Sequence, residues 1–160
     1  MIFKTEQALS DFAENLGKTL QAPAVFELIG DVGAGKTTFT RALARGLGIQ
    51  TPVTSPSFTI CNRYERSALP TCDNNRDATP VTKNPPLELI HYDFYRLSDP
   101  GLMRDDLAES LANKNAIIVL EWANSVVDLL PKDHIQITFE ILEDDSRKLD
   151  IKGLKNELIS

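Results

Sequence analysis

The stretch that most constrains this chain is GDVGAGKT, residues 30–37, which fits the pattern G-x-x-x-x-G-K-[ST]. A short apolar run suited to a buried strand, AVFELI at 24–29, precedes it. TTFTRALARGLGI, at 37–49, follows it with apolar residues at helical spacing. A strand, a glycine-rich loop and a helix in this order form the context that a phosphate-binding P-loop requires. We therefore predict a phosphate-binding loop here rather than a plain glycine-rich turn.

Each part of this loop has a physical task. Its glycines let the backbone curl, so that successive N–H groups point at phosphate oxygens. The helix that starts near Lys36 directs the positive end of its dipole at the same anion. We predict that Lys36 reaches the β- and γ-phosphates of a nucleotide and that the hydroxyl of Thr37 binds Mg²⁺.

Strand-like and helical segments alternate along the rest of the chain. The predicted strands are 24–29, 57–64, 87–95, 116–122, 134–142 and 147–153. The predicted helices are 5–20, with Thr5 as N-cap, 37–49, 99–112 and a short one at 124–130. We expect a single α/β domain over 1–160, similar to P-loop NTPases, with a mostly parallel central sheet flanked by helices. The last two strands are predicted to finish the sheet as an antiparallel edge hairpin.

One segment breaks this alternation. ERSALPTCDNNRDATPVTKNPP, at 65–86, contains four prolines and many small polar residues, with little apolar periodicity. We interpret about 66–86 as an exposed insertion in a hairpin, and as a candidate for disorder, rather than as a dedicated binding loop.

The charge balance restricts the partners of the chain. Lys and Arg number 17 against 23 Asp and Glu, which gives a net charge of −6 over 160 residues. Affinity for nucleic acid comes from cationic contacts, so any contact with RNA is expected to be indirect, through a partner. The chain shows no signal-peptide pattern and no apolar run of membrane-spanning length, and Cys61 and Cys72 match no metal-binding spacing. We expect a cytoplasmic protein with reduced thiols and no membrane contact.

A P-loop that hydrolyses a nucleotide needs a second carboxylate near the metal, usually at the end of a neighbouring apolar strand. Glu121 closes IIVLE, and Asp93 closes LELIHYD. We predict that Glu121 serves the Mg²⁺ shell and that Asp93 orients the attacking water or acts as general base. Alternatively, Glu121 is a carboxylate at the edge of the sheet that pairs with a nearby lysine. Asp93 is alternatively an N-cap or turn residue.

Hydroxyl groups follow the P-loop helix in VTSPSFT, residues 53–59. Switch loops occupy this position in many P-loop proteins, and a hydroxyl of Ser55, Ser57 or Thr59 could sense the γ-phosphate through Mg²⁺. A capped turn explains the same residues equally well.

The histidines are interpreted as structural. His91 and His134 each lie on a strand-like segment with no second metal ligand nearby in sequence. Cys61 is interpreted as a small packing residue on its strand.

Four motifs together resemble one family. GDVGAGKTTFTRAL, VTSPSFT, HYDFYRL and LEW occur in the order and approximate spacing of the TsaE family, formerly YjeE. These are bacterial ATPases needed to make threonylcarbamoyladenosine in tRNA. The resemblance runs from about residue 5 to about residue 150. HYDFYRL and LEW discriminate best, because any P-loop protein could supply the first motif.

The resemblance implies a Mg²⁺-dependent ATPase that acts on the TsaD–TsaB complex and resets it between turnovers, without performing the carbamoyl transfer. Its contact with tRNA would be indirect, through that complex. By resemblance, Thr37 and Glu121 serve Mg²⁺, and Lys36, Asp93 and Glu121 are the catalytic residues. The phosphate-binding residues implied are Gly33, Ala34, Gly35, Lys36, Thr37 and Thr38.

The resemblance also assigns weaker roles. Trp122 resembles a tryptophan beside the metal carboxylate, although core packing explains it equally well. Glu6 and Gln7 resemble a segment near the nucleotide's base, and Arg147 resembles a late arginine near the nucleotide, or is a solvated hairpin charge. Ser57 stands where the family usually has threonine, which predicts weaker ordering of the switch loop.

A phosphate-binding loop also occurs in three other functional classes. A GTPase reads guanine with [NT]-K-x-D after a strand, and neither NKNA at 113–116 nor TKNP at 82–85 qualifies. A small-molecule kinase needs a lid of arginines, whereas Arg66, Arg76 and Lys83 are scattered among prolines. A nucleotide-sensing module, in which ATP organises an interface and hydrolysis is incidental, stays open.

Overall fold

The protein is described by a computed structural model that covers residues 1–56, 59–66, 87–95, 97, 99 and 101–154. Its strands are β1 (Ile2–Phe3), β2 (Ala24–Ile29), β3 (Cys61–Glu65), β4 (Glu88–Asp93), β5 (Ala116–Glu121), β6 (Ile135–Ile141) and β7 (Arg147–Lys152). Its α-helices are α1 (Glu6–Thr19), α2 (Lys36–Gly46) and α3 (Met103–Ala112). Two 3₁₀ turns, η1 (Ala123–Ser125) and η2 (Val127–Leu129), follow β5.

The described strands form one sheet in the order β1-β7-β6-β2-β5-β4-β3. The four central strands, β6, β2, β5 and β4, are parallel to one another, and the outer strands are antiparallel to their neighbours. The α/β class, with a parallel core and antiparallel C-terminal strands, is therefore as predicted. Because the central strands are parallel, their carboxyl ends share one edge of the sheet, and ligands bind at this edge in open α/β folds.

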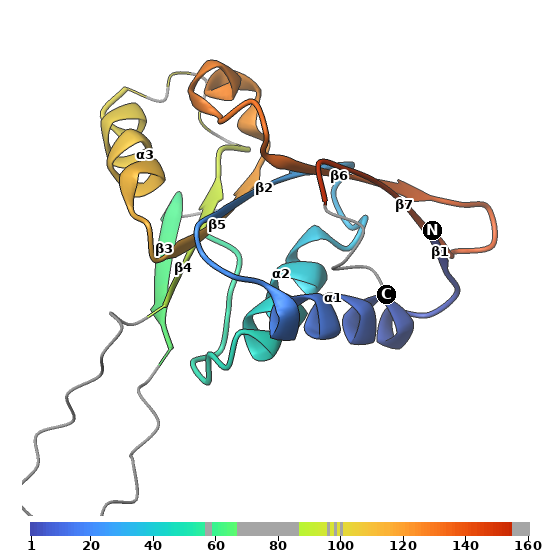
Figure 1. The fold of residues 1–160 in the computed structure, drawn as a ribbon. Helices are drawn as coiled ribbons and strands as arrows, with labels where there is room; N and C mark the ends of the chain where they lie inside the picture. Colours follow the sequence, from blue (N-terminus) through green and yellow to red (C-terminus); the bar gives the residue numbers. More distant parts are fainter. Residues whose placement is uncertain (57–58, 67–86, 96, 98, 100, 155–160) are drawn as a thin grey trace, which may run out of the picture.

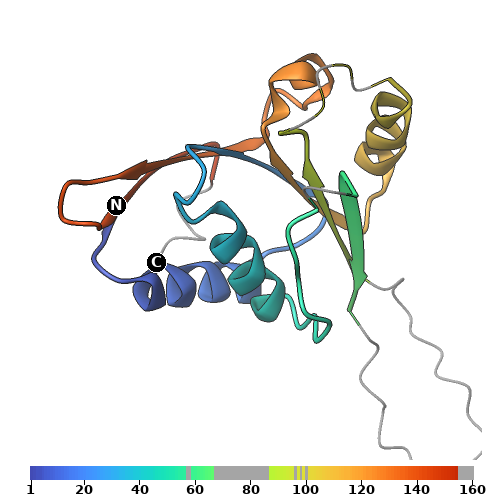
Figure 2. The same ribbon diagram turned by 180° about the vertical axis from the view of Figure 1, so that it is seen from behind.

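Helices cover the two faces of this sheet unequally. In Figures 1 and 2, α1 and α2 lie together on one side, and α3 lies with the 3₁₀ turns on the other. Alternating strand residues divide accordingly: Leu89 of β4 packs in the core under α1 and α2, whereas Ile90 and Tyr92 pack in the core beside α3. Strands buried on both faces explain the continuous apolar run of β5, in which all six residues are buried.

Helix α2, which follows the glycine-rich loop, is held against α1 by a close contact between glycines. A Cβ on Gly46 would lie 2.0 Å from the carbonyl oxygen of Glu14, and one on Gly17 would lie 2.4 Å from that of Leu43. The two backbones can approach this closely only because neither residue has a side chain. This contact fixes the direction in which α2 presents its first residues, Lys36 and Thr37, to the edge of the sheet.

The structure differs from the sequence-based expectation in three elements. A two-residue strand, β1, pairs with β7, so the C-terminal hairpin is not the edge of the sheet. The strand expected at 57–64 begins only at Cys61, because Ile60 has φ of 68°. The helix expected at 124–130 is two 3₁₀ turns, since Val126 breaks it at φ −132°, ψ 11°.

Other expectations agree with the structure or lie outside it. Thr5 caps α1 as predicted, accepting a hydrogen bond from the backbone N–H of Ala8 at 3.1 Å. The predicted insertion at 66–86 falls, apart from Arg66, outside the described residues. No helix within the described ranges is long and apolar enough to cross a membrane.

Candidate functional site

The loop between β2 and α2 curls because its glycines adopt conformations that other residues avoid. Gly35 is the N-cap of α2 with φ of 107°, in the left-handed region. A Cβ there would also lie 3.1 Å from Cδ2 of Leu9. Within the described part of the chain no side chain caps α2, so its first N–H groups remain available to an anion.

Lys36 lies folded into this loop with 4% of its surface exposed. Its Nζ donates to the carbonyl oxygens of Gly30 at 2.7 Å and Asp31 at 2.9 Å. Burial lowers the pKa of Lys36 from its ordinary value, while the nearby charges of Glu121 and Asp93 oppose that shift. An anion that enters the loop adds negative charge beside this ammonium group and therefore favours its charged form.

The two predicted carboxylates end neighbouring parallel strands. Asp93 of β4 is paired in register with Glu121 of β5, and both are buried. The hydroxyl of Thr37 donates to Oε1 of Glu121 at 3.3 Å. The first turn of α2 therefore meets the end of β5 across a sequence separation of 84 residues, which spacing alone could not show.

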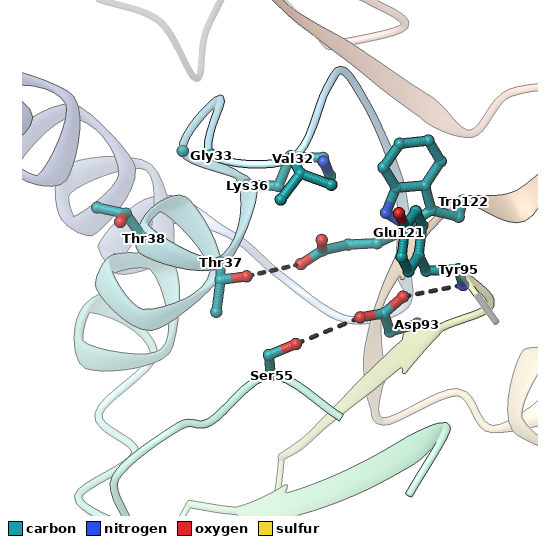
Figure 3. Close-up of a pocket in the computed structure, with 11 residues that line it drawn as sticks. Val32, Gly33, Lys36, Thr37, Thr38, Ser55, Asp93, Tyr95, Glu121 and Trp122 are labelled. Atoms are coloured by element: carbon teal, nitrogen blue, oxygen red, sulfur yellow. Dashed lines mark hydrogen bonds between the residues drawn. The ribbon is translucent and has the colours of Figure 1, made fainter. Parts of the chain in front are cut away.

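Asp93 faces the same opening and also shapes the turn that follows it. Its Oδ2 accepts a hydrogen bond from Oγ of Ser55 at 3.2 Å, and its Oδ1 accepts one from the backbone N–H of Tyr95 at 3.0 Å. Figure 3 shows both contacts beside the contact between Thr37 and Glu121. The contact with Tyr95 agrees with the turn interpretation of Asp93, and its role toward a water molecule stays a prediction.

A cavity of about 330 Å³ opens between the loop and these strand ends. It brings together Asp93, Glu121 and five of the six residues predicted to bind phosphate: Gly33, Gly35, Lys36, Thr37 and Thr38. Ala34 is the exception, because it is buried in the core and its N–H donates to the carbonyl oxygen of Asp31 at 3.2 Å. Val32, which the motif leaves unspecified, lines the cavity and is 69% exposed.

Two aromatic rings form one wall of the cavity. Trp122 lies 4.9 Å from Tyr95 between ring centroids, and Nζ of Lys36 lies 4.6 Å from the centre of the Trp122 ring. Trp122 has φ of 58°, a conformation that costs on the order of 1–3 kcal/mol in a residue other than glycine. It also packs against the core beside α3, as the packing interpretation expects, while its role beside a metal carboxylate stays a prediction.

A second cavity of about 250 Å³ shares Gly33, Gly35 and Thr38 with the first. Glu6 and Arg147 line it, from the start of α1 and the start of β7. Gln7 does not, because its amide turns outward and donates to Oδ1 of Asp11 at 2.7 Å.

The hydroxyl groups of the 53–59 segment occupy different environments in the structure. Ser55 lines the first cavity, whereas Thr59 donates to Oδ1 of Asn62 at 2.9 Å in an exposed position. Ser57 lies outside the described residues, so its role remains a prediction. Cys61 packs against the core beside α3, where burial raises the pKa of its thiol.

Sequence reasoning missed one residue that lines this cavity and one contact behind it. Tyr95 follows Asp93 by two positions and lines the cavity with 52% of its surface exposed. His91, interpreted as structural, lies outside the cavity lining, but its Nε2 is 3.0 Å from Oε1 of Glu121, a contact that was not predicted from the sequence. The spacing His-x-Asp was the available signal, because alternate residues of a strand point to the same face.

The donor set fits Mg²⁺ bound together with a nucleotide. Magnesium is usually held by one or two protein oxygens, with the remaining positions filled by phosphate and water. Thr37 and Glu121 supply such oxygens beside the loop. Among the described residues no group of three or more His, Cys, Asp and Glu side chains could hold a metal ion.

Comparison with known proteins settles the family. The family model described as "Threonylcarbamoyl adenosine biosynthesis protein TsaE" matches residues 3–149. The chain belongs to the TsaE family. It is 34% identical over 133 residues to the tRNA threonylcarbamoyladenosine biosynthesis protein TsaE of Bacillus subtilis, covering 82% of this chain and 71% of that protein.

Two further comparisons extend over nearly the whole chain. The TsaE protein of Treponema pallidum is 29% identical over 150 residues, which is 94% of this chain and 97% of that one. The crystal structure of YdiB from Bacillus subtilis superimposes with a TM-score of 0.66 and 25% sequence identity, covering 99% of this chain and 86% of that chain. The resemblance seen in the four sequence motifs is therefore confirmed at the level of family and fold.

Proposed function

We propose that this TsaE-family chain binds ATP with Mg²⁺ and hydrolyses it to ADP and phosphate, in support of threonylcarbamoyladenosine synthesis on tRNA. The observation that carries the proposal is the contact between the Thr37 hydroxyl and the Glu121 carboxylate at 3.3 Å. This contact joins the start of α2 to the buried carboxylate at the end of β5. Asp93, at the end of β4, is paired in register with Glu121. P-loop enzymes hold Mg²⁺ and the terminal phosphates between parts of this kind.

The phosphate groups would lie on the first turn of α2, where free N–H groups and the helix dipole attract an anion. Lys36 would keep its position and share its charge between the loop carbonyls and the β- and γ-phosphate oxygens. The Trp122 ring beside Nζ keeps water away from one side of this cation.

Bound Mg²⁺ would supply positive charge to the β- and γ-phosphate oxygens during phosphoryl transfer. Thr37 and Glu121 would hold it, because the hydroxyl oxygen can bind a cation while its proton continues to point at the carboxylate.

Asp93 would act on the attacking water. Ser55 and the N–H of Tyr95 hold its two oxygens, so that the carboxylate cannot rotate freely. As the water oxygen bonds to the γ-phosphorus, the carboxylate would accept a proton of that water. The bond from the γ-phosphorus to its bridging oxygen then breaks, and ADP and phosphate leave.

The second cavity gives the base and ribose a place next to the phosphate loop. It adjoins Gly33 and Thr38 on the side of the loop that faces the start of α1. Glu6 and Arg147 offer an acceptor and a donor there, which supports the predicted approach of Arg147 to the nucleotide.

Guanine is disfavoured by the position of the NKNA segment. Asn113 ends α3, and Asn115 lies just before β5 begins at Ala116. These residues are at the amino end of β5, whereas the loop faces Glu121 at its carboxyl end. The base-reading motif of a GTPase would have to lie at the carboxyl ends of the parallel strands, beside the glycine-rich loop.

The partner would be the TsaD–TsaB complex, which ATP hydrolysis resets between turnovers, and tRNA would be met only through that complex. The net charge of −6 supports an indirect contact with RNA. The test is phosphate release from ATP and Mg²⁺, measured with and without purified TsaD–TsaB. Stimulation supports the proposal. Unchanged release beside ATP-dependent co-purification would favour the nucleotide sensor, and no ATP binding would refute both.

A further inference from the structure

His91 lies in the middle of the strand that ends in Asp93, and its side chain is fully buried. Alternation along β4 turns His91 and Asp93 toward α1 and α2, whereas Tyr92 and Phe94 stack in the other core at 5.7 Å. On this face Nε2 of His91 reaches Oε1 of Glu121 at 3.0 Å. The imidazole therefore stands behind the predicted metal carboxylate, on the side away from the cavity, whose lining does not include it.

Burying this ring costs free energy that packing alone does not explain. Among the residues that the structure describes, Nδ1 of His91 has no hydrogen-bond partner. Leaving a buried polar atom unsatisfied costs about 1–3 kcal/mol, and an apolar side chain would avoid that cost. The contact that His91 does make requires the proton on Nε2, because a carboxylate oxygen can only accept.

The Glu121 carboxylate needs a hydrogen-bond donor that fixes its orientation. Its Oε1 accepts from His91 and from Thr37, and Oε2 makes no hydrogen bond within the described ranges. A free glutamate side chain has several rotatable bonds, and fixing them costs up to about 2 kcal/mol. A donor rooted in the centre of β4 would fix the carboxylate before any ligand arrives, while Oε2 would bind the metal or its water.

We propose that His91 is a positioning residue, which donates from Nε2 to Glu121 and holds that carboxylate in the orientation that receives Mg²⁺. The inference rests on the proposed function, because it assigns His91 to the metal side of the same site. His91 acts through Glu121 and touches neither the nucleotide nor the phosphate loop.

Two variants separate a hydrogen-bond role from a packing role. His91→Gln keeps an N–H donor at about the reach of Nε2, whereas His91→Asn carries the same amide one methylene shorter and cannot reach Glu121. The chain also contains a matched control. Nε2 of His134 lies 3.1 Å from Oε2 of buried Glu27, and neither residue lines the first cavity, so His134→Asn removes a buried His–Glu contact outside the site.

The readout is Mg²⁺ titration at saturating AMP-PNP, followed by the fluorescence of Trp122, the only tryptophan of the chain, which lies at the cavity. His91→Asn is expected to raise the half-saturating Mg²⁺ concentration roughly 10- to 100-fold, the effect of removing a partner of a metal carboxylate. His91→Gln is expected to remain close to wild type, and His134→Asn to be unchanged. AMP-PNP affinity in EDTA should be the same in all four proteins.

Equal Mg²⁺ dependence of His91→Asn and wild type would overturn the inference and leave the proposed function intact. Absence of any Mg²⁺ response in wild type would overturn the proposed function itself. Should both His91 variants fail to fold, nitrogen-15 NMR of the wild-type imidazole decides. A proton on Nε2 with a bare Nδ1 supports the inference, and a proton on Nδ1 overturns it.

Discussion

Replacing Gly46 by alanine tests how helix α2, which follows the glycine-rich loop, is held. A Cβ at this position would lie 2.0 Å from the carbonyl oxygen of Glu14, 2.9 Å from its carbonyl carbon and 2.9 Å from Cα of Gly17. All three are backbone atoms, so no flexible side chain can yield. Real Cβ atoms do not approach others within 3.0 Å, which requires α1 and α2 to separate by about 1 Å.

The expected loss follows from two opposing effects. Alanine favours a helix over glycine by up to about 1 kcal/mol in a helix interior, and by less at the last residue of α2. Overpacking typically costs about 1–3 kcal/mol, and a gap approaching 1 Å weakens the remaining contacts between the helices. We predict a net destabilisation of about 2 kcal/mol, equivalent to a fall in Tm of roughly 4–8 °C.

The assay is urea and thermal unfolding followed by far-ultraviolet circular dichroism. Asn15→Ala, on the exposed side of α1, is the control and should gain slightly in stability from helix propensity alone. ATP affinity should also fall for Gly46→Ala, because the displaced helix carries Lys36 and Thr37. A Gly46→Ala protein as stable as wild type, or more stable, would refute this account of the helix contact.

Three further outcomes are expected at the site. Lys36→Ala should lose most ATP affinity because the loop loses its buried cation, and calorimetry that finds normal affinity would contradict the assignment. Asp93→Ala should still bind ATP yet hydrolyse it roughly a hundredfold or more slowly, and unchanged single-turnover rates would remove Asp93 from the mechanism. Arg147→Ala should weaken ATP binding severalfold but leave pyrophosphate binding unchanged; equal losses for both ligands would place Arg147 away from the base.

Local patterns in the sequence were sufficient for most of the fold. The run AVFELI became β2 over the predicted bounds, because a largely apolar run of six residues before a glycine loop suits a buried parallel strand. Thr5 capped α1 because its hydroxyl satisfies a free N–H of the first turn. The turns after β5 were mispredicted, because Val126 and its neighbours fit a helical pattern over a segment too short to sustain an α-helix.

The site was predictable as a set of residues but not as a set of contacts. Spacing indicated that Lys36, Asp93 and Glu121 lie at strand or helix ends, and a parallel sheet brings such ends to one edge. The pair His91 and Glu121 required the register of β4 on β5, which no local pattern encodes. The strand β1 was missed for the same reason, since two residues gain their structure only by pairing with β7.

The most direct measurement is the anomalous scattering of Mn²⁺ in a crystal of the chain grown with AMP-PNP. One metal peak is predicted at bonding distance from the Thr37 hydroxyl and from a phosphate oxygen, with the Glu121 carboxylate turned toward it and Asp93 facing the terminal phosphate. A metal bound elsewhere, or a nucleotide whose phosphates lie outside the loop that ends in Lys36 and Thr37, would contradict the account.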